Sequence, residues 1–186
     1  MRLRYLFPLL ALAAVQAHAA DSFVIDAAHT YPVFAVNHHG FTTQHGRFDK
    51  TSGQLVLDFG AHTGSGTIHI DTASINMGLE AWNKAMREKF FDVTQYPTAT
   101  YAFDKLEFEA DKPVAADGRL TLLGVTRPLR LSVQRFHCGS SPTTKKFTCG
   151  ADLAGSLRRS DFGMLRSLPG VGDEIQLVIA VEAYKE

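Results

Sequence analysis

The sequence predicts an all-β protein, an antiparallel barrel or sandwich of about eight strands with one short α-helix. Apolar residues recur at every second position in most segments after residue 20, which is the period of a strand with one buried face. Short turn sequences separate these segments, and no repeated strand–helix unit occurs. Alternation alone does not separate a barrel from a sandwich, because both have one buried and one solvated face.

The strands are expected in order along the chain. Their alternating apolar positions fall in segments 34–38, 55–59, 68–70, 101–108, 120–122, 129–136 and 175–183, and turn sequences occupy 49–53, 60–64, 117–118 and 169–173. The alternation changes parity between Phe103 and Leu106, which predicts a β-bulge there. Residues 79–91 break the pattern, since Leu79, Trp82, Met86 and Phe90 share a face at helical spacing.

The first nineteen residues have the three parts of a secretory signal peptide. Arg2 and Arg4 precede an apolar run of about eleven residues, and Ala17 and Ala19 form a small-x-small cleavage site. The run is shorter than the roughly twenty residues that cross a bilayer. We therefore expect residues 1–19 to be removed and residues 20–186 to form one domain outside the cytoplasm.

The composition limits the classes of partner that this domain is expected to bind. Without residues 1–19 it carries 17 basic and 19 acidic residues, so it lacks the basic excess that holds a nucleic-acid backbone. No second apolar run of membrane length follows. The domain is expected to be soluble, which leaves transient membrane contact and a homodimer open.

The two cysteines of the chain, Cys138 and Cys149, enclose a polar segment that reads as the loop of a hairpin. An even count in an oxidising compartment predicts a disulfide. A zinc site is the competing interpretation, but it needs a second pair of ligands.

The chain contains no convincing enzyme motif. It has no Gly-x-Ser-x-Gly elbow and no glycine-rich phosphate loop. The histidines after residue 20 are His29, His38, His39, His45, His62, His69 and His137, and none has a recognised metal-ligand spacing. If His38 and His39 are adjacent on a strand, they point to opposite faces; Asp26 and His29 can meet across a turn. No catalytic residue, metal or cofactor is predicted.

Seven motifs occur in the order in which a known family has them. They are Ile-Asp-x-x-His-Thr at 25–30, Phe-x-Val-x-His at 34–38, Gly-x-Phe at 46–48, Asp-x-x-Ser-Ile at 71–75, Phe-Phe-Asp with Tyr-Pro at 90–97, Gly-x-Leu-Thr-x-x-Gly-Val-Thr at 118–126 and Arg-x-Asp-Phe-Gly at 159–163. From these the chain resembles the YceI-like family of bacterial periplasmic polyisoprenoid-binding proteins.

The resemblance implies a lipocalin-like antiparallel barrel with a long apolar cavity that holds an isoprenoid or another long-chain lipid. A barrel of about eight strands is just wide enough for one small ligand. Alternation and the resemblance together place these residues at the lipid: Phe34, Val36, Phe48, Ile75, Trp82, Met86, Phe90, Tyr101, Phe103, Leu122 and Phe162. Asn83 and Arg159 are expected near the polar head group.

Two other functions remain open from the sequence. One is a stress-related structural protein whose barrel is filled by its own side chains, for which the 13 phenylalanines would be ordinary core. The other is a metal- or haem-assisted enzyme that uses the histidines. A packed interior would favour the first, and three converging histidines or carboxylates would favour the second.

Overall fold

The computed structural model describes residues 20–186, so the predicted signal peptide lies outside the described part. The strands are β1 (Asp21–Ile25), β2 (Tyr31–His38), β3 (Thr42–Phe48), β4 (Thr51–Asp58), β5 (Thr63–Asp71), β6 (Ile75–Asn76), β7 (Thr98–Glu109), β8 (Lys112–Leu122), β9 (Val125–Ser140), β10 (Phe147–Arg158) and β11 (Val171–Lys185). The helix α1 spans Glu80–Lys89, and two 3₁₀ turns, η1 (Thr72–Ser74) and η2 (Arg159–Phe162), complete the elements.

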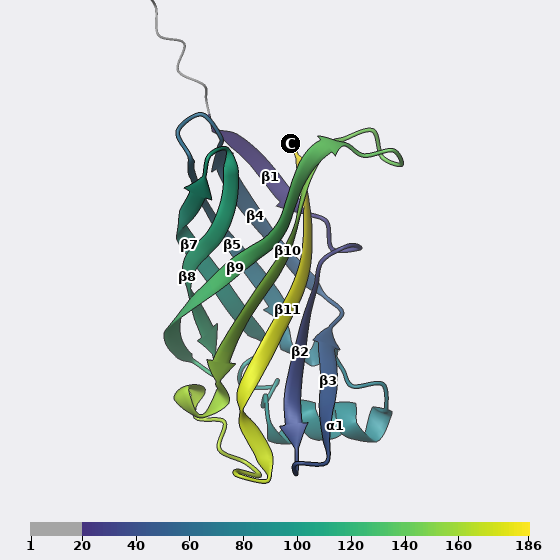
Figure 1. The fold of residues 1–186 in the computed structure, drawn as a ribbon. Coiled ribbons are helices and arrows are strands. Elements are labelled where there is room, and N and C mark those ends of the chain that lie inside the picture. The colour runs from purple at the N-terminus through teal and green to yellow at the C-terminus, as the bar shows by residue number, and fades with distance from the viewer. Residues whose placement is uncertain (1–19) are drawn as a thin grey trace, which may run out of the picture.

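The sheet closes on itself, which makes the fold a barrel and not a sandwich. Eight strands follow one another in the order β1-β4-β5-β7-β8-β9-β10-β11, and β11 pairs again with β1. All the pairings are antiparallel (Figure 1). The predicted fold class is therefore confirmed.

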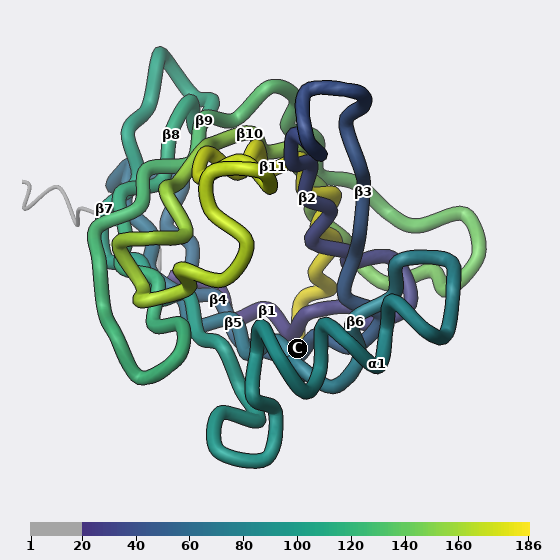
Figure 2. Tube along the Cα trace, turned by 90° about the horizontal axis from the view of Figure 1, so that it is seen from below, coloured from purple at the N-terminus to yellow at the C-terminus, as the bar shows by residue number. Residues whose placement is uncertain are grey.

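Strand β11 has two partners along the same edge. Its C-terminal part, Ala183–Lys185, pairs with β1, and its N-terminal part, from Val171 to Ala180, pairs with β2. Beyond β2 the sheet continues into β3 and β6. One end of the barrel is thus completed by the short β2–β3–β6 extension together with α1, which lies across this end in Figures 1 and 2.

The period-two pattern of the sequence becomes the inside and outside of the barrel. On β11, Ile175, Leu177 and Ile179 face inward and line the interior, whereas Val178 between them is 62% exposed. The register of β7 with β8 shifts between Phe103 and Lys105. This irregularity is the predicted bulge, and it lets Phe103 and Leu106 both reach the interior despite their opposite parity.

At the end of the barrel opposite α1, Phe23, Ile25, Leu57, Cys149 and Ala183 form a buried cluster, and this end is referred to below as the packed end. Cys138 and Cys149 lie directly opposite each other in the β9–β10 hairpin and are joined by a disulfide, as predicted.

The other end, next to α1, is referred to as the open end, because Trp82 lines the interior there and is 39% exposed. This end carries one departure from the sequence prediction. Strand β2 ends at His38, and His39 lies in the following turn with a left-handed φ of 54°. The two rings therefore meet edge-on with centroids 4.6 Å apart instead of pointing to opposite faces of a strand. Within residues 20–186, no helix has the length and apolar character needed to cross a membrane.

Candidate functional site

The barrel encloses an apolar cavity of about 420 Å³. Its lining follows β11 from Val171 to Ala183 and continues onto the inner faces of β4, β5, β7, β8, β9 and β10. At about 3.4 Å per residue, this run of β11 is roughly 40 Å of strand. The volume is within the range of about 300–1,000 Å³ that is typical of ligand sites, so the interior is not filled by its own side chains.

The lining contains few polar side chains, and most of them are satisfied by the barrel itself. The Thr30 hydroxyl donates to the carbonyl of Glu182 and accepts from its N–H. The Tyr101 hydroxyl lies 3.1 Å from the carbonyl oxygen of Ala116 and 3.2 Å from that of Leu129, and burial raises the pKa of this phenol. These groups therefore leave the cavity wall effectively apolar.

His38 and Gln44 are the polar lining side chains with hydrogen-bonding capacity to spare. Both line the cavity at the end where β2 and β3 meet the α1 side of the barrel. The Gln44 amide nitrogen donates to the Thr42 hydroxyl at 2.8 Å, which leaves its carbonyl oxygen available. The His38 ring lies 6.2 Å from the Trp82 ring, centroid to centroid, so an aromatic side chain of the helix stands beside the polar pair.

Most of the residues predicted to contact a lipid do line this cavity. They are Phe34, Val36, Phe48, Trp82, Met86, Phe90, Tyr101, Phe103 and Leu122. The other two, Ile75 and Phe162, belong to the packed core around the open end, with 2% and 3% of their surface exposed, and they are not among the lining residues.

The two residues expected near a head group are both engaged in hydrogen bonds within the protein. Arg159 is among the residues that line the cavity. The Arg159 side chain is 3% exposed. Its guanidinium donates to four carbonyl oxygens, those of Met164, Arg166, Val171 and Gly172, at 2.7–2.9 Å. It therefore holds the loop between η2 and β11, and burial lowers the pKa of this guanidinium.

Asn83 lies at the start of α1 and is not among the lining residues. Its side-chain oxygen accepts from the Met77 N–H at 2.6 Å, and its amide nitrogen lies 3.4 Å from a carboxylate oxygen of Glu80. These contacts join the helix to the segment that precedes it. Among the polar side chains of the lining, His38 and Gln44 are the two whose hydrogen-bonding capacity is not taken up by the barrel.

The sequence analysis missed a large part of the wall. The lining also contains Leu153 and Leu157 from β10, Ile175, Leu177, Ile179 and Val181 from β11, and Phe59, Leu106, Phe108 and Phe136 near the packed end. The alternation on β11 had marked its residues as one face. It could not identify that face as a cavity wall, because a filled core shows the same pattern.

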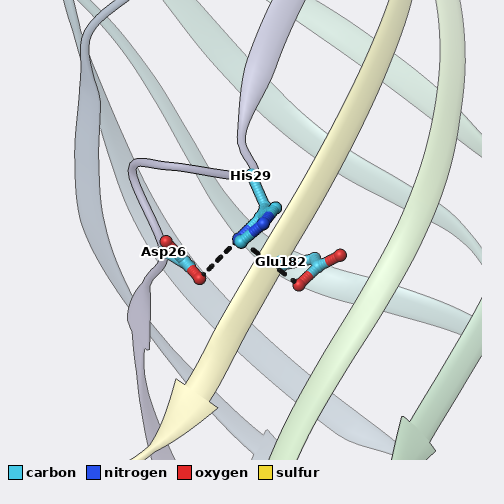
Figure 3. A group of neighbouring side chains, drawn as sticks. All are labelled: Asp26, His29 and Glu182. Atoms are coloured by element: carbon cyan, nitrogen blue, oxygen red, sulfur yellow. Dashed lines mark hydrogen bonds and ion pairs between the residues drawn. The ribbon is translucent and has the colours of Figure 1, made fainter. Parts of the chain in front are cut away.

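One cluster of titratable groups lies outside the cavity, and Figure 3 shows it. The Nδ1 atom of His29 is 2.9 Å from a carboxylate oxygen of Asp26 and 4.0 Å from one of Glu182. Asp26 also accepts a hydrogen bond from the N–H of Ala28. The predicted hydrogen bond between Asp26 and His29 across a turn is therefore confirmed by the 2.9 Å distance between their side chains. Glu182 joins through the pairing of β1 with β11, which no local sequence signal reveals.

This cluster meets the distance requirement for a metal site, with ligand atoms within 4.8 Å of one another. Its environment favours a hydrogen-bonded turn instead. The His29 side chain is 61% exposed. The pKa of Asp26 is lowered, first by the hydrogen bond from His29 and to a smaller extent by the positive charge of Lys146. A nearby ammonium group opposes the binding of a cation.

A closed antiparallel barrel with a single covering helix and an apolar interior defines the class of lipocalin-like barrels. Residues 23–183 match the model of the YceI-like domain. The chain therefore belongs to the YceI-like family.

Relatives and solved structures agree with this assignment. UPF0312 proteins of Azotobacter vinelandii and Shewanella putrefaciens are 28% and 29% identical over 94% of this chain, which covers 92% and 93% of their lengths. The fold is similar to that of Burkholderia cenocepacia BcnA, with a TM-score of 0.69, 24% identity, and coverage of 85% of this chain and 98% of that chain. It also resembles a polyisoprenoid binding domain from Saccharophagus degradans, with a TM-score of 0.66, 20% identity, and coverage of 88% and 98%.

Proposed function

We propose that this protein binds a long-chain amphiphile, an isoprenoid lipid such as a polyprenyl chain or a quinone, and carries or stores it in the periplasm. The observation that carries the proposal is the apolar cavity of about 420 Å³ with two polar side chains at one end, His38 and Gln44, that have hydrogen-bonding capacity to spare. The description of the Saccharophagus degradans neighbour as a polyisoprenoid binding domain supports the choice of ligand class.

The energetic reason for such a cavity is the cost of apolar surface in water. Each CH₂ group that leaves water for an apolar site gains about 0.8 kcal/mol, so an isoprenoid tail of several units does not cross an aqueous compartment freely. The deep part of the cavity, between Leu153, Leu177 and Phe103, would hold the tail. His38 and Gln44 would face the polar head, where an imidazole and an amide can both donate and accept hydrogen bonds.

The same geometry supports binding without catalysis. The one phenol of the wall, Tyr101, has its hydroxyl directed at backbone carbonyls and its pKa raised by burial. A filled structural barrel is disfavoured by the cavity volume itself. The metal-enzyme alternative is disfavoured by the position of the Asp26–His29–Glu182 cluster on the outer surface.

The experiment is native purification of the exported protein followed by organic extraction and mass spectrometry of the extract. We expect one class of isoprenoid lipid at close to one molecule per protein. The variant Leu177→Trp places a large ring in the middle of the cavity and should abolish the bound lipid. Val178→Trp is the matched control, because it adds the same ring to the outer face of the same strand.

The thermal melts separate the proposed cavity from a packed core. If lipid normally occupies the space, Leu177→Trp should keep most of its stability. If the core is packed, the same change should cost about 1–3 kcal/mol or more through overpacking. A wild-type protein that carries no lipid and takes up no added quinone, with a Leu177→Trp variant of much lower stability, would overturn the proposal.

Export is part of the proposed function. Cleavage after Ala19 should leave Ala20 as the first residue, because Ala17 and Ala19 are the small residues that a signal peptidase reads. The intact mass of protein released from the periplasm tests this. A mature species that retains residues 1–19 would refute it.

A further inference from the structure

Exposed apolar side chains gather around the open end of the barrel. Seven large hydrophobic residues are exposed among residues 20–186, and four of them belong to segments that surround the cavity mouth. They are Phe41 at 87%, Leu165 at 61%, Leu79 at 55% and Trp82 at 39% exposure. We refer to these four residues as the rim.

The rim residues come from three segments that other contacts hold together at the mouth. Phe41 is in the β2–β3 turn, and the N–H of His39 in that turn donates to the carbonyl of Gly170 at 2.7 Å. Gly170 ends the loop between η2 and β11, which carries Leu165. Figure 2 looks along the barrel from this end and shows the β2–β3 turn, the yellow-green loop and α1 at this end of the barrel.

The third segment is the start of α1, and it touches the cavity directly. Trp82 lines the cavity, with its ring beside that of His38, and Leu79 lies about one helical turn before it. Phe41, Leu79 and Leu165 do not line the cavity. The rim is thus an outward-facing apolar surface continuous with the apolar interior.

The charges of these segments are sparse and mostly positive. The β2–β3 turn with its flanks, residues 38–45, has no Asp, Glu, Lys or Arg, and residues 163–171 have only Arg166. Residues 77–90 carry Lys84, Arg87 and Lys89 against Glu80 and Glu88. The mouth therefore combines apolar tips with a small basic excess, whereas residues 20–186 as a whole carry two more acidic than basic residues.

We propose that the rim docks the open end of the barrel onto the surface of a phospholipid bilayer that contains anionic lipids, so that the cavity mouth meets the membrane. This inference rests on the proposed function, because it supplies the route by which a lipid enters the cavity without crossing water. Phenylalanine and leucine tips enter the acyl boundary, tryptophan suits the head-group level, and the basic residues meet lipid phosphates.

The chemistry of the rim favours a bilayer over a protein partner. Its apolar residues come from three separate segments, which are the β2–β3 turn, the loop before β11 and the start of α1. A bilayer accommodates separate apolar tips without shape complementarity, whereas a stable protein interface needs a well-packed buried core. An isoprenoid lipid also dissolves in the bilayer, so docking at the mouth would let the lipid pass from the bilayer into the cavity.

The test is flotation of the purified protein with vesicles of phosphatidylethanolamine and phosphatidylglycerol, compared with vesicles of phosphatidylcholine alone. Trp82 is the only tryptophan of the chain, so its emission should shift to shorter wavelength on docking. The double variant Phe41→Ser/Leu165→Ser should lower the partition coefficient at least about tenfold, since each lost side chain removes apolar area that the membrane buries.

The matched control is Phe147→Ser/Val178→Ser, which also removes one phenylalanine and one aliphatic residue. These positions are 42% and 62% exposed but lie away from the mouth, so the control should float like the wild type. Bound lipid is measured on all three proteins by mass spectrometry, and the rim variant should still hold added quinone, because neither Phe41 nor Leu165 lines the cavity.

Two results would overturn the proposal. One is a wild type that carries lipid but does not float with either kind of vesicle, which would leave the proposed function intact. The other is a wild-type dimer in light scattering that Phe41→Ser/Leu165→Ser makes monomeric, without flotation of either protein, which would assign the rim to a second copy of the chain. A wild type that floats but never binds lipid would support rim docking and refute the proposed function instead.

Discussion

Replacement of Arg159 by methionine should destabilise the barrel strongly. The guanidinium donates four hydrogen bonds to carbonyl oxygens of the loop between η2 and β11, and a hydrogen bond to a charged group contributes about 1.5–3 kcal/mol. The full sum is not expected, because most of these carbonyls are only partly buried and can bind water in the variant. Removal of the charge also relieves its desolvation. We expect a loss of about 3–5 kcal/mol.

Urea unfolding followed by tryptophan emission and circular dichroism measures this loss. For a protein of this size, 1 kcal/mol corresponds to roughly 2–4 °C in the melting temperature, so a decrease of about 10 °C is also expected. The matched control is Arg158→Met at the neighbouring position. The Arg158 side chain is 71% exposed and pairs with Asp173 at 3.1 Å, and an exposed ion pair is worth about 0–1 kcal/mol.

The same pair of variants tests the role of Arg159 against the head-group role expected from the sequence. A structural role predicts that Arg159→Met loses stability, and that ligand retained at low temperature is still bound. If Arg159→Met is as stable as Arg158→Met but releases its lipid, the guanidinium acts on the ligand and the reasoning from its four carbonyl contacts is wrong.

Three other outcomes follow from described contacts. Replacement of Cys138 and Cys149 by alanine should cost about 3 kcal/mol, because the disulfide closes a loop with a sequence separation of 11; unchanged unfolding in urea would contradict this. The hydrogen bond to Asp26 raises the pKa of His29 above 6.5, so its stabilising effect is present at low pH and is lost as the pH rises through the folded value. In NMR titrations, Asp26→Asn should lower the pKa of His29 toward its ordinary value, while the charge of Glu182 still raises it. Tyr101→Phe should cost about 1 kcal/mol and leave lipid binding unchanged, measured by unfolding and by extraction.

The sequence was sufficient for the elements whose faces differ clearly in polarity. Period-two alternation located β11 and the bulge of β7, and helical spacing located α1 to within two residues at each end. Strand β10 was not predicted, because the small residues Gly150, Ala151, Ala154 and Gly155 interrupt its alternation of apolar and polar side chains. In the structure the small residue at 155 has a reason, since a Cβ there would lie 2.8 Å from the Leu131 side chain.

The site was predictable only in part, for a physical reason. Parity tells which strand side chains point inward, and helical spacing does the same for α1. The inward positions of Phe34, Phe103 and Met86 were therefore predictable, and all three line the cavity. Neither pattern tells whether an inward residue meets packed neighbours or open space, and Ile75 and Phe162 proved to be packed. The role of Arg159 depended on carbonyls up to thirteen residues away, and a chain segment gives no sign of where its carbonyl oxygens will point.

Strand β11 pairs with both β1 and β2 along one edge, and this pairing also determines when the barrel can close during folding. This strand pairs with β1, β2 and β10, and two of these partners lie near the other end of the described chain. Closure is therefore a non-local event, and topologies of high contact order fold slowly. Until residues 171–185 have been synthesised, β1 lacks the partner that closes the ring, and β2 lacks the strand that joins it to the barrel. A nascent chain of this kind stays unfolded for longer, which is the state that a secretory translocation channel accepts.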